Sequence, residues 1–357
     1  MSRPIAMRIL IVRLGALGDV VHTLPVAAAL RRRFPAASVD WVIDERFAAL
    51  LELVPDLDRR IVLRTRGGRP AAAWRALRRE LREAAYDVAL DVQGLGKSAL
   101  AARLSGARRV VGFAAPFLRE RWARWLYTET ADPGRPRHVV DRNLGILGAL
   151  GAAGDDWSFP IRTGPSPAVD SLRRRLDPPG GGYVVINPNA AWSTKRWPAD
   201  RYGAVAAHVR RAHGRPAVVI WGPGDESRAA AAVSASAGTA ILAPPTDLVE
   251  LAALLQAGAL LVSGDTGPLH LAAALGTPVV GLYGPSDPVR NGPWSPDDRV
   301  VSAFPACDCA ARRAGTGRSV HMVRRCGART RCLETVSVER VCAAVDRRLE
   351  AVDSAHA

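Results

Sequence analysis

The chain has 357 residues, of which 48% are hydrophobic, and a formal net charge of +15. This length favours two domains with sizeable apolar cores. No apolar run reaches the roughly 18 residues that a membrane span needs. The chain also enters a strand at once, without a small-residue cleavage site, so we expect neither a span nor a signal peptide.

Most of the charge excess is arginine, which indicates either a coding bias or an acidic partner such as nucleic acid, an anionic membrane or an anionic substrate. We expect no nucleic acid, because there is no zinc-finger spacing, no aromatic RNA-binding signature and no long basic tail. Five cysteines do not fit a disulfide framework, so a reducing cytoplasm is expected.

Short apolar runs alternate along the chain with longer, helix-like stretches. Strands are predicted first at residues 8–13, 38–43, 59–64, 87–92 and 108–113, and later at 183–188, 216–222, 239–244, 259–265 and 278–284. Helices are predicted at 24–34, 72–85, 97–106, 202–214, 248–258, 268–276 and 336–352. Nearly continuous apolar strands separated by helices form parallel sheets covered on both faces. The sequence therefore predicts an α/β protein with two doubly wound, Rossmann-like halves. Residues 160–182, rich in Pro and Gly, are expected to join them, with a short helix in the middle.

The stretch "IVRLGALGDVVHTLP", residues 11–25, begins as a buried strand, turns on Gly15 and Gly18, and enters a helix. A helix N-terminus usually suits a phosphate, because its first N–H groups are free and its end is partly positive. Here Asp19 follows the second glycine and would repel an anion. The stretch thus raises the question of what its carboxylate does.

A second stretch with the same layout is "SGDTGPLHLAAALGTPVVGLYGPSDP", which starts at Ser263. Its strand ends at a turn with Asp265 and Thr266, and a helix follows. Free N–H groups of Thr266 and Gly267, a hydroxyl and the imidazole of His270 would converge at the carboxyl edge of a sheet, where ligands bind. This pattern indicates a phosphate or nucleotide-diphosphate site. The alternative is an ordinary capped helix with a surface histidine.

Two further stretches belong to the second half. In "NPNAAWSTKRWP", Lys195 is a compact charge suited to a phosphate, while Trp197 before Pro198 is expected to pack and fix the loop. In "WGPGDESRA", Glu226 near a helix start either favours the helix dipole or accepts hydrogen bonds from a ribose. Both readings of Glu226 stay open.

Together these stretches resemble the ADP-heptose:lipopolysaccharide heptosyltransferases of glycosyltransferase family nine, over nearly the whole chain. "MRILIVRLGALGDVVHTLP" and "DVQGLGKSALAARL" also contribute, and "DWVIDERFAALL" and "DVQGLGKS" are most similar to the enzymes that act on Kdo of the inner core. The resemblance implies a GT-B fold of two facing Rossmann-like domains. Residues 1–168 would bind the acceptor and 169–334 the ADP-sugar, and residues 335–357 would form a helix packing back on the N-terminal domain.

The resemblance also implies an inverting transfer from ADP-heptose to Kdo-lipid A that needs no cofactor and no metal. Asp19 matches the general base, and Lys195 would stabilise the departing ADP. The donor would lie among Ser193, Thr194, Lys195, Glu226, Asp265, Thr266, Gly267 and His270. The acceptor would lie among Gly18, Arg64, Arg66, Lys97 and Arg119, although any one of these cations can equally be a solvated surface residue.

One departure concerns the phosphates. Relatives often carry two threonines four and five residues before the lysine, where this chain has Ala190 and Ala191. Ser193 and Thr194 lie close and are expected to substitute for them.

Four cysteines, Cys307, Cys309, Cys326 and Cys332, cluster in one segment together with His321. Their spacing is not that of a standard zinc ribbon. Reduced structural thiols, a zinc site and disulfides all remain open, and reduced thiols are favoured.

The leading hypothesis is thus a cytoplasmic enzyme, peripheral on the anionic inner face of the inner membrane, that adds heptose to Kdo. An enzyme of the same fold with another acceptor, such as the second core heptose, or with another sugar nucleotide is the alternative. A sugar-nucleotide epimerase would need no acceptor, and a non-enzymatic binding module would not need Asp19.

Overall fold

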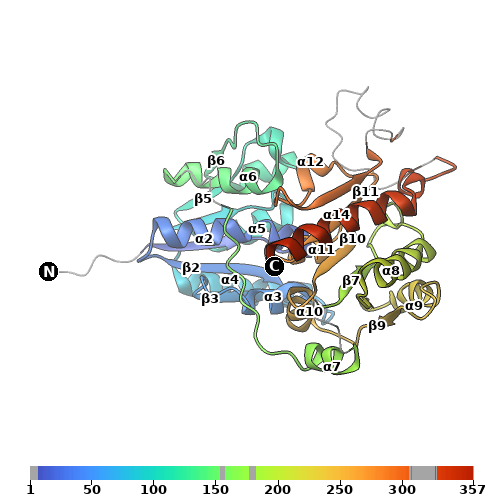
Figure 1. The fold of residues 1–357 in the computed structure, drawn as a ribbon. Helices are drawn as coiled ribbons and strands as arrows, with labels where there is room; N and C mark the ends of the chain where they lie inside the picture. The colour runs from blue at the N-terminus through green and yellow to red at the C-terminus, as the bar shows by residue number, and fades with distance from the viewer. Residues whose placement is uncertain are drawn as a thin grey trace. The chain divides into compact units, whose positions relative to one another are not determined.

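The computed structural model describes residues 7–152, 157–176, 182–304, 307, 326 and 328–356. The chain divides into two compact units, Met1–Arg162 and Thr163–Ala357 (Figure 1). This division falls after Arg162, whereas the sequence analysis places the domain boundary after residue 168. Every strand and helix predicted from the sequence is present, including a helix in the joining segment, α7 (Pro167–Leu176).

The first unit is built on a six-stranded sheet in the order β3-β2-β1-β4-β5-β6, and all neighbouring strands are parallel. The strands are β1 (Arg8–Val12), β2 (Ser38–Asp44), β3 (Arg59–Leu63), β4 (Val88–Asp91), β5 (Arg109–Phe113) and β6 (Glu129–Ala131). The central strand β1 is buried from Ile9 to Val12, as expected of a parallel strand covered on both faces. The short edge strand β6 was not predicted from the sequence.

Helices connect these strands and cover the sheet. They are α1 (Leu17–Val21), α2 (Leu24–Arg33), α3 (Ala48–Glu52), α4 (Pro70–Ala84), α5 (Gly96–Leu104) and α6 (Val139–Leu144), with the 3-10 helices η1 (Glu45–Phe47), η2 (Ala115–Phe117), η3 (Arg121–Leu126) and η4 (Gly145–Leu150). Helix α4 shows why: Leu77, Leu81 and Ala84 lie on one face and are buried in the core of this unit.

The second unit repeats the design with the order β12-β11-β10-β7-β8-β9, again all parallel. The strands are β7 (Val184–Asn187), β8 (Ala217–Val219), β9 (Ala240–Leu242), β10 (Leu260–Gly264), β11 (Val279–Tyr283) and β12 (Arg299–Ser302). Of these, only the edge strand β12 was not predicted.

The remaining helices of the second unit are α8 (Ala199–His213), α9 (Glu226–Ser234), α10 (Leu248–Gln256), α11 (Gly267–Ala274), α12 (Pro288–Asn291) and α14 (Val338–His356), with η5 (Ser193–Lys195) and η7 (Cys332–Thr335). Local sequence sets their ends. Helix α10 begins in a capping box, in which Asp247 Oδ1 accepts from the Glu250 N–H at 2.8 Å and Glu250 Oε2 accepts from the Asp247 N–H at 3.3 Å.

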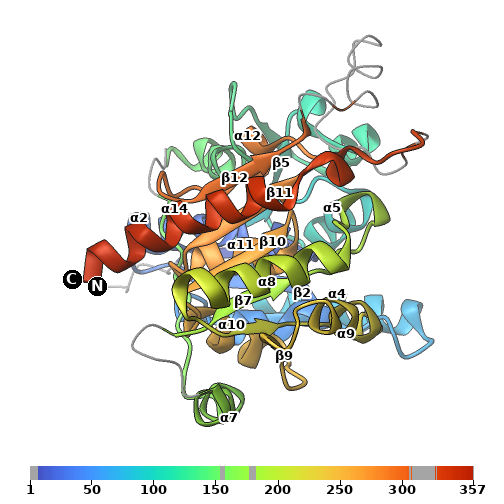
Figure 2. The same ribbon diagram turned by 45° about the vertical axis from the view of Figure 1, so that its right-hand side comes forward.

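The C-terminal helix α14 is part of the second unit. It packs against α8, β10, β11 and β12, and Figure 2 shows it beside α8 over this sheet. Val341, Val345 and Leu349, on one face of the helix, are fully buried in the core of the unit. This helix thus packs within the second unit, and its packing on the N-terminal domain stays a prediction.

Trp197 confirms its predicted packing role. Its side chain is fully buried in the core of the second unit, and its Nε1–H donates to the Val336 carbonyl at 3.0 Å. The bond joins the loop after β7 to the residues just before α14.

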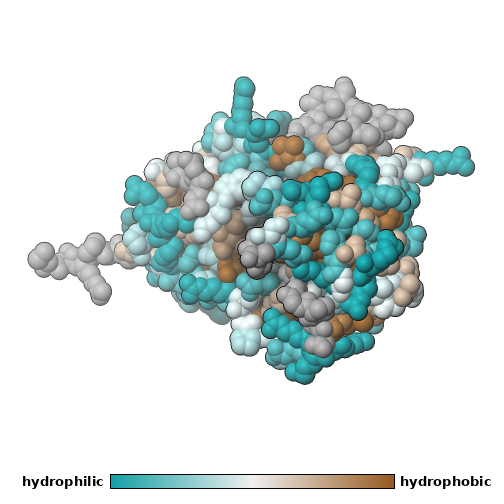
Figure 3. Space-filling model, in the orientation of Figure 1, coloured by the Kyte–Doolittle hydropathy of each residue, from teal (hydrophilic) through white to brown (hydrophobic). Residues whose placement is uncertain are grey.

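No helix in the described part of the chain is long and apolar enough to cross a membrane. The face seen in Figure 3 is mostly hydrophilic, with apolar residues showing in small areas.

Candidate functional site

The predicted acceptor residues follow the strands of the first sheet. Asp19 comes after β1, Arg64 and Arg66 after β3, Lys97 after β4 and Arg119 after β5. Because the carboxyl ends of parallel strands meet at one edge, the fold brings these residues to the same edge of the sheet, where the strand order also reverses at β1.

Asp19 lies in the first turn of α1 and its side chain is 49% exposed. Arg13, the residue directly after β1, is nearly buried and places its Nη2 2.9 Å from Asp19 Oδ1. The Nη1 of Arg13 donates to the Val92 carbonyl at 2.8 Å. The carboxylate is therefore held on one side by an anchored guanidinium and is open to solvent on the other. Gly18 lies beside it in α1 and adds no side chain there.

The turn before Asp19 is packed closely. A Cβ on Gly15 would lie 2.5 Å from the ring of Phe47, which explains why a glycine stands there. The preceding residue, Leu14, is bonded to Gln93, whose Oε1 accepts from the Leu14 N–H at 2.8 Å. The loops after β1 and β4 are thus tied together.

A buried carboxylate that the sequence analysis did not single out, Asp91, organises the loop after β4. Its oxygens accept from the Gln93 N–H at 2.9 Å, the Ser98 hydroxyl at 3.0 Å and the Tyr127 hydroxyl at 2.7 Å. Burial raises the pKa of Asp91, even though these hydrogen bonds oppose the rise. In the sequence, the one feature that could have pointed to Asp91 is its position at the end of a predicted buried strand, in the stretch "DVQGLGKS".

The four predicted acceptor cations, Arg64, Arg66, Lys97 and Arg119, are all exposed. The loop of Arg64 and Arg66 is nevertheless fixed by Glu45, the residue that follows β2. Glu45 Oε1 accepts from the N–H groups of Thr65 and Arg66 at 2.9 and 2.7 Å. The edge therefore presents positive charge on a positioned backbone, which suits an anionic ligand.

The second sheet brings the predicted donor residues together at its own carboxyl edge. Lys195, in the loop after β7, places its Nζ 2.5 Å from Asp265 Oδ2 and 3.2 Å from the Asp265 carbonyl. His270 Nε2 lies 3.0 Å from the other carboxylate oxygen. Burial alone would raise the pKa of Asp265, but Lys195 and His270 hold it well below its usual range.

This geometry refines the predicted role of Asp265, which is 4% exposed. Its carboxylate orients the side chains of Lys195 and His270. A lysine has three N–H donors; Lys195 directs two of them at Asp265, and its Nζ lies 5.1 Å from the centre of the Trp192 ring.

The start of α11 is built to present backbone N–H groups. Thr266 is the N-cap residue, yet within the described residues no side chain caps this helix. The Thr266 hydroxyl instead meets Asn187 Nδ2 at 3.1 Å and the Ser263 hydroxyl at 3.0 Å. The first N–H groups, including that of Gly267, are thus left for an anion.

The loop after β7 contains Ala190 and Ala191, and its two hydroxyl-bearing residues, Ser193 and Thr194, differ in exposure. Thr194 is buried, whereas Ser193 is exposed. Ala190 is buried too, and its carbonyl accepts from Arg196 Nε at 2.8 Å. Of the two residues expected to substitute for the missing threonines, Ser193 is therefore the better placed to reach a ligand.

Comparison with known proteins decides the family. The model of glycosyltransferase family 9 (heptosyltransferase) matches residues 74–317. Lipopolysaccharide heptosyltransferase 1 of Pseudomonas aeruginosa is 31% identical over 311 residues, covering 85% of this chain and 86% of that protein. The chain belongs to glycosyltransferase family 9.

Solved structures agree with this assignment. A family 9 glycosyltransferase from Veillonella parvula has a TM-score of 0.79 at 24% identity, covering 97% of both chains. The E. coli heptosyltransferase WaaC with ADP has a TM-score of 0.71 at 25% identity, covering 98% of this chain and all (100%) of that one. The family 9 chain is thus a glycosyltransferase of GT-B fold with two Rossmann-like units, as predicted.

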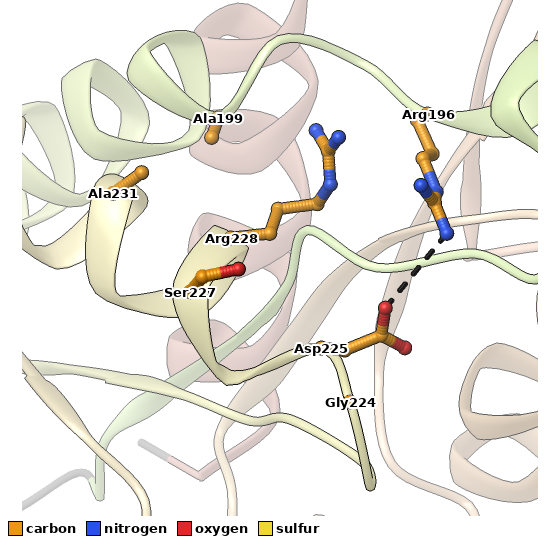
Figure 4. Close-up of a pocket in the computed structure, with 7 residues that line it drawn as sticks. All are labelled: Arg196, Ala199, Gly224, Asp225, Ser227, Arg228 and Ala231. Carbon is orange, nitrogen blue, oxygen red and sulfur yellow. Dashed lines mark ion pairs between the residues drawn. The ribbon is translucent and has the colours of Figure 1, made fainter.

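In this family 9 enzyme, Glu226 is exposed at the first position of α9. Beside it is a pocket of about 320 Å³ between α9 and the start of α8, lined by Arg196, Ala199, Gly224, Asp225, Ser227, Arg228 and Ala231 (Figure 4). Arg196 Nη2 and Asp225 Oδ1 are 3.8 Å apart. This pocket was not predicted from the sequence, because its two arginines, Arg196 and Arg228, come from separate segments of the chain.

The cysteine prediction can be followed only in part, since Cys309 and His321 lie outside the described residues. Cys307, Cys326 and Cys332 carry free thiols. Burial, followed by the nearby Cys307, raises the pKa of Cys332 to about 12. Reduced structural thiols, the favoured reading of this segment, stay a prediction.

Within the described residues, one group of side chains could hold a metal ion: His208, His213 and Asp346. Both imidazole Nε2 atoms lie near Asp346 Oδ1, at 2.7 and 2.8 Å. They join α8 to α14, two helices that carry none of the predicted donor residues.

Proposed function

We propose that this heptosyltransferase moves a heptose from ADP-heptose to Kdo of the lipopolysaccharide inner core, with inversion at the anomeric carbon. The observation that carries the proposal is Asp19, a half-exposed carboxylate held by Arg13 at the carboxyl edge of the first sheet. The names of the curated relatives support the choice of reaction, since several are lipopolysaccharide heptosyltransferase 1 at about 31% identity.

In the proposed step, the acceptor hydroxyl oxygen attacks the anomeric carbon while the bond from that carbon to the ADP oxygen breaks. Asp19 takes the hydroxyl proton, and ADP leaves with the bonding electron pair. A single displacement of this kind needs one base and no protein nucleophile, which matches one open carboxylate. General-base assistance contributes roughly 10²–10⁴ in rate.

The leaving ADP gains negative charge, and the second unit offers groups to receive it. Lys195 keeps one N–H donor free of Asp265, and the start of α11 presents backbone N–H groups. Fixed donors aimed at developing charge stabilise a transition state without reorganisation. We assign Glu226 to the nucleoside of ADP-heptose, and Ser193, Thr194 and His270 to its surroundings.

We further propose that turnover needs no metal ion. Among the described residues, the proposed donor edge holds one buried carboxylate, Asp265, and both of its oxygens are already engaged by Lys195 and His270. A lysine and a helix N-terminus can supply the positive charge that a metal would otherwise bring.

The acceptor, Kdo-lipid A, is itself an anionic lipid. We assign its charged groups to Arg64, Arg66, Lys97 and Arg119, and propose that the enzyme works as a peripheral protein on the cytoplasmic face of the inner membrane. The net charge of +15 favours such attachment.

The deciding experiment incubates the purified protein with ADP-heptose and Kdo-lipid A and weighs the product. We expect one added heptose with release of ADP. A control acceptor that already carries the first heptose should stay unchanged. If only this control gains mass, the enzyme adds a later core heptose. If ADP-heptose is converted without an acceptor, the proposal of transfer is wrong.

A further inference from the structure

The first unit exposes two tryptophans that the proposed reaction does not use. Trp122 and Trp125 of η3 are 57% and 78% exposed, and Leu100 of α5 is 39% exposed. Helix η3 packs on α5. Large apolar side chains that remain in water are unusual on a monomer surface and mark interaction sites when they gather.

These three residues form one surface, here named the tryptophan patch. Trp122 lies directly over Gly96, since a Cβ on that glycine would be 2.1 Å from its ring. Leu100 is four residues further along α5 and so lies on the same helix face. Trp125 follows Trp122 by three residues in a 3-10 helix, where such residues share a face.

The patch is held rigidly. Ala123, between the two tryptophans, is fully buried and anchors η3. Glu120 Oε2 accepts from the Gly96 N–H at 2.8 Å, which ties the residue just before η3 to the start of α5. The indoles are therefore presented by fixed backbone, so their exposure is built into the fold.

Positive charge surrounds the patch. Five exposed cations lie on α5, on η3 or just before η3: Lys97, Arg103, Arg119, Arg121 and Arg124. The guanidinium of Arg124 lies 4.9 Å from the centre of the Trp125 ring. Between Lys97 and Leu126 the sole carboxylate is that of Glu120, which already serves as the acceptor for Gly96.

We propose that the tryptophan patch docks the first unit on the surface of an anionic lipid bilayer. Indole side chains favour the headgroup region, where one part of the ring is apolar and the other is wet. Arginines near an anionic surface add attraction to lipid phosphates. A soluble polyanion would use the cations but leave the indoles in water, so the combination favours a bilayer. The inference rests on the proposed membrane location and names the surface responsible.

The test measures binding to vesicles of phosphatidylglycerol and phosphatidylethanolamine by co-sedimentation. Trp125→Ala should weaken binding roughly tenfold, since it removes one apolar anchor. The double variant Arg121→Gln/Arg124→Gln should weaken it about fivefold per arginine. Trp122→Ala is a poorer probe because that ring also packs on Gly96.

Matched controls keep the test specific. Val300→Ala removes an apolar side chain of the second unit that is 41% exposed, and should bind as the wild type does. Arg78→Gln/Arg79→Gln on α4 lowers the net charge equally within the first unit. We expect it to bind distinctly better than the η3 double variant. Equal loss in both double variants would show non-specific charge attraction and overturn the proposal.

Turnover of a deacylated, water-soluble Kdo acceptor separates docking from catalysis. Trp125→Ala should keep wild-type kcat and KM on this acceptor. If it instead raises KM as much as it weakens vesicle binding, the patch belongs to the acceptor site and docking is wrong. If the wild type binds vesicles but transfers no heptose, docking stands while the proposed function fails.

Discussion

The two carboxyl edges of this enzyme handle charge in opposite ways. In the first unit Asp19 is 49% exposed and the predicted acceptor cations stand in solvent. In the second unit Asp265 is 4% exposed, and Lys195 is held by it before any ligand arrives. A fixed edge suits the invariant ADP group of the proposed donor, whereas an open edge suits the large anionic lipid that we propose as acceptor.

The largest expected effect is that of changing Asp19, the proposed general base at the open edge. Asp19→Asn should lower kcat by about two to four decades, because an amide cannot take the proton. ADP affinity and melting temperature should stay near the wild-type values, since the side chain is half exposed and makes its ion pair only with Arg13 among the described residues. Wild-type-like kcat in this variant would rule out the assignment of the base.

At the fixed edge, Lys195→Ala should weaken ADP binding by about 10- to 100-fold in calorimetry, because a charged hydrogen-bond donor is lost. It should also lower the free energy of unfolding by roughly 3–5 kcal/mol, since the buried Asp265 loses its lysine partner and keeps only its contact with His270.

The double variant Lys195→Ala/Asp265→Asn is the matched control. It should regain part of the stability but not the ADP affinity. Recovery of ADP binding would mean that Lys195 does not contact the phosphates.

A smaller effect is expected for Arg119→Ala. Because this side chain is exposed, its loss should raise the acceptor KM only about two- to fivefold and leave ADP affinity unchanged. Arg79→Ala, an exposed arginine of α4, should change neither value. If Arg119→Ala damages ADP binding instead, the roles of the two units are reversed.

The smallest expected effect is that of removing metal ions. Turnover should survive dialysis against EDTA, because Lys195 and the start of α11 are proposed to stabilise the leaving ADP. Loss of activity that Mg²⁺ or Mn²⁺ restores would overturn the proposal.

The features that were not predicted from the sequence have two causes. The edge strands β6 and β12 are three and four residues long, too short to show a hydrophobic period. The pairing of Asp265 with Lys195 was not predicted because the two residues are 70 positions apart, and the pocket next to α9 likewise joins separate segments of the chain. Pairings of this kind depend on which strands become neighbours.

The sequence by itself determined the ten main strands, the residues at which they end and the parallel type of the two sheets. It could do so because strands that are buried on both faces have a continuous run of apolar residues. It also determined the family, through motifs that each lie within one strand, turn and helix. Only the tertiary structure decided which charges are neutralised and which stay open. Arg13 reaches both Asp19 and Val92, and Asp265 takes up Lys195 and His270, because parallel strands bring the ends of distant segments to one edge.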